Sequence, residues 1–428
     1  MNENKYSKKF ILLSSLFQKG LLNIMGASVI NKIIALLSNI FIVRILSKVE
    51  YGRYGWAYNI VSFFLLFNGL GIQYGILQFC SENIGVLLKK EYYKFGFLYG
   101  IAVGILLSVG LLVYSLFGTV SLPEGRKILI ILSFIPIFDF LYNYILIVLR
   151  SNLQNKEYSI VTNINSIFHF IFMLGGAFFI GIKGYIIGLY LSYIIVFMYV
   201  LLINKNKIYN ILITPIQKIS YYTHILKYSL ICACNVAISQ LLYILDVFLI
   251  GIYISDAKIV ASYKASIGIP TSMQFITTSI ILVVYPYFAK NRKNIVWIKN
   301  NTKKAILGLA ILNIPIGIIL FIGAEYIIYI LYGKQYLDAV PIFRILAISY
   351  IIITTFRIPC GNILAMLRKV KINLIVTIIC GSVNIILDIV LINKIGAIGA
   401  AYATLGVVIL DSILSGISLI WYLHKNSR

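Results

Sequence analysis

The sequence predicts an all-α, polytopic membrane protein of about 12 transmembrane helices in two pseudo-symmetric six-helix halves. Of the 428 residues, 61% are apolar and only 12% are charged, whereas soluble proteins have about 45–50% apolar and about 25% charged residues. One membrane-spanning helix needs about 20 apolar residues, so this surplus is enough for about twelve spans. The excess apolar surface is therefore expected to face lipid.

Apolar runs between clusters of charged residues place the individual spans. The first six are expected near residues 22–43, 56–78, 95–118, 128–149, 159–181 and 184–203. The second six are expected near 228–251, 259–288, 305–328, 340–364, 372–392 and 397–422. The domains that follow are an amphipathic lead-in (1–21), an N-terminal half (22–203), a basic connector (204–227), a C-terminal half (228–422) and a tail (423–428).

The distribution of Lys and Arg orients these spans. The net charge is +24, from 37 Lys and Arg against 13 Asp and Glu. With the N-terminus in the cytoplasm, 24 of the 37 basic residues fall in cytoplasmic segments and nine in the opposite loops. Because cytoplasmic loops are enriched in Lys and Arg, both termini and the connector are predicted to be cytoplasmic. The positive charge therefore reflects topology, and no nucleic-acid partner is expected.

The two halves resemble each other in sequence. A polar stripe in the first span recurs in the seventh with the same spacing, and Gly181 and Gly184 recur as Gly396 and Gly399, displaced by 215 residues. Repeated halves are typical of transporters, which bind their substrates between the repeats. The two stripes, displaced by 207 residues, consist of Ser28, Lys32, Ala35 and Asn39 and of Asn235, Ser239, Leu242 and Asp246.

Motifs for catalysis are absent from the sequence. There is no GxxxxGK[ST] phosphate-binding loop and no HExxH metal motif. The three histidines lie far apart, and the five cysteines are scattered through apolar runs. We therefore predict a non-enzyme with no catalytic residues, no metal site and no cofactor.

Lysines at membrane depth mark the expected substrate cavity. An ionised side chain at the centre of a span costs about 2.5–3.5 kcal/mol, so it should face the protein interior. Lys32 lies at the middle of the first span beside Asn31 and Asn39, and Lys264 lies in the eighth span. With Asn235 and Ser239 of the seventh span, these side chains are expected to line a hydrated, cationic cavity.

The acidic residues at membrane depth have two interpretations. Asp246 and Asp139 could bind a coupling proton or sodium ion, or they could neutralise buried cations such as Lys264. The second interpretation, charge pairing, is preferred for Glu325 and Asp388, which are expected to pair structurally with Arg344. All three residues fall in the outer halves of their spans.

The link between the first two spans suggests a family. Its sequence from Arg44 to Gly55, RILSKVEYGRYG, resembles the corresponding link in polysaccharide-repeat flippases of the multidrug/oligosaccharidyl-lipid/polysaccharide superfamily. The stretches Ala261–Pro270 and Tyr285–Ala289 fit the same family. With the twelve-span layout, the resemblance extends over most of the chain.

This resemblance implies a flippase of the bacterial inner membrane. Such a protein moves undecaprenyl-diphosphate-linked oligosaccharides across the membrane by alternating access, for O-antigen (lipopolysaccharide) or capsule synthesis. Its implied partners are the lipid-linked oligosaccharide, membrane lipid, and the polymerase and chain-length proteins of the same pathway. Relatives that flip the peptidoglycan precursor carry arginines in the first, second and eighth spans. Here Lys32 and Lys264 stand near two of these places, which favours a different polyprenyl-diphosphate cargo.

Two alternatives have distinguishing features. A multidrug or cation antiporter of the same superfamily would share the topology, but cationic drugs favour an acidic, aromatic cavity rather than one centred on lysines. A membrane-embedded polysaccharide polymerase or ligase would need a long external loop with Arg and His. The expected external loops are short and lack histidine.

Overall fold

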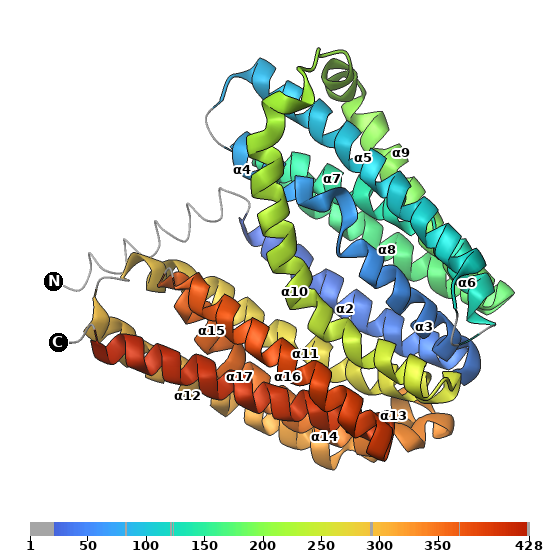
Figure 1. Cartoon of the computed structure of the whole chain (residues 1–428), viewed down its shortest axis with the longest axis vertical. Helices are drawn as coiled ribbons and strands as arrows, with labels where there is room; N and C mark the ends of the chain where they lie inside the picture. Colours follow the sequence, from blue (N-terminus) through green and yellow to red (C-terminus); the bar gives the residue numbers. More distant parts are fainter. Residues whose placement is uncertain are drawn as a thin grey trace. The chain divides into compact units, whose positions relative to one another are not determined.

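The protein was analysed as a computed structural model that describes residues 21–81, 84–119, 122, 124–291, 294–367 and 369–425. Within these ranges all regular secondary structure is helical (Figure 1). The predicted all-α, polytopic fold class is confirmed.

The described residues of the first half of the chain form ten helical elements. They are α2 (Leu21–Ile45), α3 (Lys48–Leu65), the 3₁₀-helix η1 (Asn68–Gly71), α4 (Ile72–Ser81), α5 (Val86–Phe117), α6 (Gly125–Leu132), α7 (Ile135–Ser151), α8 (Asn155–Ile180), α9 (Ile182–Leu212) and η2 (Ile219–Tyr222).

The described residues of the second half form ten more. They are α10 (Thr223–Tyr253), α11 (Ala257–Lys290), α12 (Ile295–Ile322), α13 (Ala324–Tyr332), η3 (Lys334–Ala339), α14 (Val340–Ile352), the π-helix η4 (Ile353–Arg357), α15 (Ile358–Met366), α16 (Val370–Ile395) and α17 (Ala397–Lys425).

Each of the twelve expected spans coincides with a long helix or an interrupted one. Among the described residues, nine helices are long and apolar enough to cross a membrane, and the bent pair α6–α7, with an angle of 41°, makes a tenth. The expected seventh and eighth spans are α10 and α11, which have 31 and 34 residues. Some of their side chains lie outside the described part. The chain is a multi-pass membrane protein.

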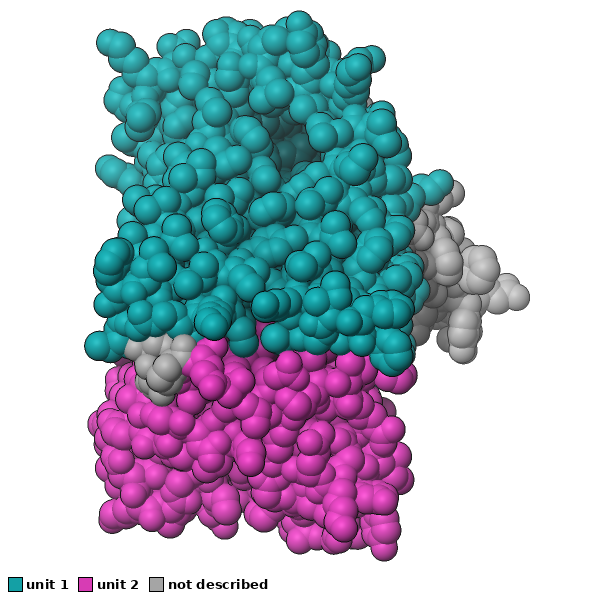
Figure 2. Space-filling model, turned by 90° about the vertical axis from the view of Figure 1, so that its right-hand side faces the viewer, with its two compact units in different colours: residues 1–38, 61–119, 126–236 teal, residues 39–60, 120–125, 237–428 magenta. Residues whose placement is uncertain are grey.

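The chain forms two compact units (Figure 2). Unit 1 comprises residues 1–38, 61–119 and 126–236, and unit 2 comprises 39–60, 120–125 and 237–428. Residues 39–60 therefore belong with the C-terminal unit, although they lie in the first half of the sequence. The reason is close packing: a Cβ at Gly52 would overlap the Ala257 carbonyl, and one at Gly251 would overlap the ring of Trp56.

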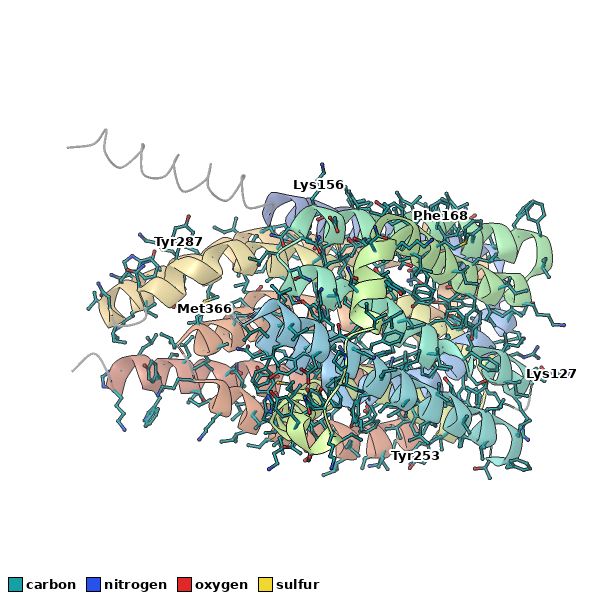
Figure 3. The ribbon with its side chains drawn as sticks, turned by 90° about the horizontal axis from the view of Figure 1, so that it is seen from above. Lys127, Lys156, Phe168, Tyr253, Tyr287 and Met366 are labelled. Atoms are coloured by element: carbon teal, nitrogen blue, oxygen red, sulfur yellow. The ribbon has the colours of Figure 1, made fainter. Side chains whose placement is uncertain are left out.

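Within each unit, labelled side chains identify the two ends of the helices (Figure 3). In unit 1, Lys127 and Lys156 lie toward opposite ends. In unit 2, Tyr253 lies at one end, while Tyr287 and Met366 lie at the other. The consecutive loops marked by Lys127 and Lys156, and those marked by Tyr253 and Tyr287, therefore lie at opposite ends of their units, as a chain that crosses a membrane requires.

One helical hairpin occurs once in each unit with the same geometry. In unit 1 it is α8–α9, joined by Gly181 at φ 68°, and in unit 2 it is α16–α17, joined by Gly396 at φ 69°. Each glycine donates its N–H to the carbonyl four residues earlier at 2.9 Å. The first residues of α8 and α16 differ by 215 in number, as the glycines do, so the repeat seen in the sequence is also a structural repeat.

Candidate functional site

Two carboxylates meet inside unit 2. Asp246 lies on α10 with 7% of its surface exposed, and Asp388 lies on α16 with 0% exposed. Asn384, one helical turn before Asp388, lines the same pocket as Asp246, so the two carboxylates lie on neighbouring helices that face each other. Among the described residues, neither forms an ion pair with a lysine or arginine. Two adjacent carboxylates are not both ionised unless a cation lies between them, so this pair needs a shared proton or a bound cation.

The hydrogen bonds of this pair are incomplete. Asp246 Oδ2 accepts a bond from the hydroxyl of Tyr263 at 2.6 Å and another from that of Thr404 at 2.7 Å. In the described part of the chain, Asp246 Oδ1 and both oxygens of Asp388 are buried without a donor. Asn384, one helical turn before Asp388 on α16, is 3% exposed. These oxygens can bind a proton or an oxygen-seeking cation.

A pocket in unit 2 opens onto Asp246. Its wall includes Arg357 of the π-helix, and much of the remainder is apolar. Polar side chains from four helices also contribute to it, which makes the pocket amphipathic and suited to a ligand with hydroxyl groups. These polar residues are Thr271 and Gln274 of α11, Ser349 and Tyr350 of α14, Asn384 of α16 and Thr404 of α17.

Arg357 is held by an acidic partner. Its Nε donates to Asp411 Oδ2 at 2.7 Å, and Ser415 donates to the other oxygen of Asp411 at 3.0 Å. Asp411 is 6% exposed. The guanidinium therefore lies at the pocket wall with its charge balanced inside unit 2.

Lys264 is a largely buried cation with no acidic partner among the described residues. Its Nζ is 3.4 Å from the Gly55 carbonyl oxygen and 5.8 Å from the ring centroids of both Tyr54 and Tyr58. Tyr263, the preceding residue, points to Asp246, while Lys264 points to the aromatic pair. An ion pair between Lys264 and Asp246, one of the two predicted roles of Asp246, is therefore not observed among the described residues.

The predicted structural pairing of Glu325, Arg344 and Asp388 is also not observed among the described residues. Glu325 is exposed in the first turn of α13, and Arg344 is partly buried on α14. None of the ion pairs among the described residues includes any of the three. Position along a span gave the depth of these residues, but the rotation of each helix sends them to different neighbours.

The remaining predicted cavity residues have different environments. Lys32 is exposed on α2, and Asn31 has a buried Oδ1 without a donor. Asn39 accepts a hydrogen bond from the Tyr51 hydroxyl at 3.0 Å and packs on Gly268. Asn235 and Ser239 lie on α10, but their side chains are outside the described residues. Their expected role in sugar binding stays a prediction.

Asp139 lies in unit 1. It accepts a hydrogen bond from Asn68 Nδ2 at 2.9 Å. No ion pair involves it in the described part of the chain. Charge pairing, one of its two predicted roles, is therefore not observed there.

Several residues of the link from Arg44 to Gly55 make hydrogen bonds within unit 2. Arg44 donates to the carbonyls of Ile330 and Leu331, which are the unpaired groups at the end of α13. Ser47 and Glu50 exchange backbone-to-side-chain hydrogen bonds of 3.2 Å and form a capping box at the start of α3.

Lys48 extends this docking of the link. Its Nζ pairs with Asp338 at 2.6 Å and donates to the Gln335 carbonyl at 2.8 Å. The first part of the link, from Arg44 to Glu50, therefore docks α3 within unit 2.

Sequence reasoning missed several residues of the acidic site. Polar residues are common in spans, so the sequence did not single out Tyr263, Asn384 or Thr404. Asp388 was assigned to other partners. One signal was present: Asn384 and Asp388 are four residues apart and lie on one helix face. Which helix that face meets could not be read from the sequence.

The sequence matches a known family over most of its length. The profile of the family described as polysaccharide biosynthesis protein matches residues 41–341. An uncharacterized membrane protein of Methanocaldococcus jannaschii is 29% identical over 182 residues. That alignment covers 40% of this chain and 34% of the relative, so the match spans about a third of the relative's length.

Solved structures share the fold over nearly the whole chain. The lipid II flippase MurJ in an inward closed conformation aligns with a TM-score of 0.77 and 21% identity, over 94% of this chain and 89% of that one. An inward-facing multidrug resistance MATE family transporter of the MOP superfamily aligns with a TM-score of 0.75 and 14% identity, over 93% and 94%. These likenesses show a common fold.

Proposed function

Because the chain belongs to the polysaccharide biosynthesis protein family, we propose that it is a flippase for undecaprenyl-diphosphate-linked oligosaccharide repeat units. The cargo would cross the bacterial plasma membrane for O-antigen or capsule synthesis, by alternating access through a cationic cavity. The MOP-superfamily fold supports a transporter, and the family supports a polysaccharide precursor.

The observation that carries the proposal is the environment of Lys264. A partly buried ammonium without an acidic partner among the described residues is costly, and its two aromatic neighbours offset only part of that cost. A diphosphate would balance this charge when cargo binds. Lys32, exposed on α2, is the second proposed countercharge. Transfer of a diphosphate through hydrocarbon without such groups would cost tens of kcal/mol by Born estimates.

Polysaccharide export in cells tests this role of Lys264. The variant Lys264→Gln should lose export, and Lys264→Arg should retain part of it because the charge survives. Lys258→Gln is the matched control, since Lys258 is exposed on the same helix. Surface polysaccharide is measured beside the amount of protein in the membrane. Normal export by Lys264→Gln would contradict the proposal.

The Asp246–Asp388 pair is the proposed coupling site. We assign the driving ion, a proton or sodium, to these two carboxylates together with Thr404 and Asn384, which line the pocket that opens onto Asp246. Binding and release of one positive charge there would change the charge of the pocket wall during the transport cycle. A membrane potential contributes about 2.3 kcal/mol per charge per 100 mV.

The same acidic pair is also the observation that favours the second candidate function, a multidrug or cation antiporter. A cationic drug would bind to the carboxylates directly. Inhibition of drug efflux by Asp388→Asn, with normal polysaccharide export, would favour this candidate over the flippase.

The proposed location is the bacterial inner membrane, with both termini and the 204–227 connector cytoplasmic. The polymerase and chain-length proteins that act on the same repeat units are the proposed protein partners. Reporter fusions at Lys207 and at the C-terminus should read as cytoplasmic, and a fusion at Lys183 should read as external. The opposite pattern would reject the orientation.

A further inference from the structure

Two interrupted helices meet inside unit 1. The helix α3 ends at Leu65, and η1 follows with three consecutive left-handed residues, namely Gly69 (φ 60°), Leu70 (φ 44°) and Gly71 (φ 74°). The second interruption separates α6 from α7, which begins with Ile135 and Pro136. A left-handed leucine is strained, so surrounding contacts must hold this backbone in place.

Asn68 connects the two interruptions. Its side-chain nitrogen donates to the Pro136 carbonyl at 3.1 Å and to Asp139 Oδ2 at 2.9 Å. An amide NH₂ has two protons, so both are committed. Asn68 is 5% exposed, and its Oδ1 is buried without a donor.

A second acceptor without a donor lies close to Asn68. Gln73 Oε1 is also buried without a donor, and it lies 3.2 Å from the position of a Cβ on Gly69, the residue after Asn68. No lysine or arginine of the described chain forms an ion pair with Asp139. Buried acceptors without donors are unfavourable unless another group satisfies them.

We propose that this junction binds a monovalent cation of the sodium type, with Asp139, Asn68 Oδ1 and Gln73 Oε1 as ligands. Carboxylate and amide oxygens are ligands that hard cations prefer. The single carboxylate matches a single positive charge, whereas a divalent ion would leave net charge buried in the membrane. The site lies in unit 1, apart from the Asp246–Asp388 pair, and its existence does not depend on the cargo.

Thermal unfolding of the full-length protein in detergent tests the site. Sodium chloride replaces choline chloride at fixed ionic strength, in the Asp246→Asn background that disables the proposed site of unit 2. Sodium should still raise the Tm in this background, and adding Asp139→Asn should abolish the effect. A sodium response unchanged by Asp139→Asn would overturn the proposal.

Substitutions at Gln73 give a test that leaves Asp139 in place. In the same background, Gln73→Glu adds a ligand charge and should lower the sodium concentration at half-maximal effect about tenfold. Gln73→Leu should raise it about tenfold. Gln78→Glu, the same change at an exposed position of α4, is the matched control and should have no effect.

Two further outcomes would overturn the proposal. Equal responses of Gln73→Glu and Gln78→Glu would show that Gln73 is not a ligand. A Tm that responds to pH but not to sodium in the Asp246→Asn background would make Asp139 a proton-binding group instead. The sodium responses of Asp139 and Asp246 are measured in separate variants. A negative result for one site therefore does not affect the conclusion about the other.

Discussion

The α8–α9 hairpin of unit 1 and the α16–α17 hairpin of unit 2 share their backbone geometry but carry different polar side chains. Both first helices have 26 residues, and both end at a glycine in the same unusual conformation. Displacement by 215 places His169 and Met173 of unit 1 opposite Asn384 and Asp388 of unit 2. Backbone geometry was therefore kept while the acidic site exists in one copy only.

The comparison separates residues that maintain the fold from those that bind ions. His169 is within 3.4 Å of Ser192 Oγ on α9 and serves to pack this hairpin. Asp388 has no such partner in the described chain, and both of its carboxylate oxygens are buried without a donor. A position that tolerates histidine or methionine in one repeat does not need a carboxylate to fold, so the carboxylate in the other repeat points to function.

The largest expected effect on transport comes from replacing Asp388, the carboxylate that the hairpin of unit 1 lacks. Asp388→Asn should reduce ion-driven transport about 100-fold, equivalent to about 2.7 kcal/mol of lost ion binding. Met173→Leu at the matching position of unit 1 should leave transport within about twofold, since it is a conservative change of an apolar residue. Transport is measured in vesicles with matched amounts of protein. Equal losses in the two variants would remove the functional distinction between the repeats.

The next effect tests the shared backbone. A side chain at Gly184 would overlap the Gly176 carbonyl, and one at Gly399 would overlap the Leu391 carbonyl. Gly184→Val and Gly399→Val should each lower stability by about 2.5 kcal/mol, because packed backbones cannot separate freely. The Tm in detergent is the measurement.

Two glycines with open surroundings provide the controls for this test. Gly175 and Gly416 have no atom within 4 Å of an added Cβ. Gly175→Ala and Gly416→Ala should be neutral or stabilising by about 0.5–1 kcal/mol. Destabilisation by these changes as large as that of the valine variants would show that close packing is not the cause.

The turn glycines should give a smaller effect of equal size in both repeats. Gly181 (φ 68°, ψ −146°) and Gly396 (φ 69°, ψ −151°) occupy a region that is almost restricted to glycine. Gly181→Ala and Gly396→Ala should each cost about 2 kcal/mol in unfolding free energy. A cost confined to one hairpin would break the structural equivalence.

The smallest expected effect is the loss of stability on replacing Tyr222, which lies in the connector of unit 1. Its hydroxyl donates to Glu91 at 2.5 Å, and burial raises the pKa of Tyr222 to about 12, with Glu91 adding to the shift. The resulting stability is fully present below the unfolded-state pKa of about 10 and is lost as pH rises toward 12. Tyr222→Phe should cost about 1 kcal/mol at pH 8 and remove this decline above pH 10. Identical pH profiles of the two proteins would contradict this assignment.

The fold could be predicted from the sequence because each span is encoded locally. Apolar runs, basic loops and paired glycines such as Gly181 and Gly396 depend only on neighbouring residues. The interruptions after Leu65 and before Ile135 were not predicted. They depend on tertiary contacts, since a left-handed Leu70 is maintained by its surroundings and not by its own preference.

The site was predicted less completely, for a geometric reason. Asp246 was recognised by its depth and by its match to Asn39. Its partners were not, because pairing depends on the rotation of each helix about its axis. Adjacent side chains on a helix point about 100° apart, so Tyr263 reaches Asp246 while Lys264 turns to Tyr54 and Tyr58.

The most direct measurement of the central claim is flipping of an undecaprenyl-diphosphate-linked oligosaccharide in vesicles that contain the purified protein. The exposed fraction of the oligosaccharide is followed with an added lectin, with and without a sodium or proton gradient. The account predicts that the gradient accelerates flipping. Lys264→Gln should abolish flipping altogether, whereas Asp388→Asn should abolish only the acceleration by the gradient. Flipping that proceeds at the wild-type rate in Lys264→Gln, or no flipping of this lipid by the wild-type protein, would contradict it.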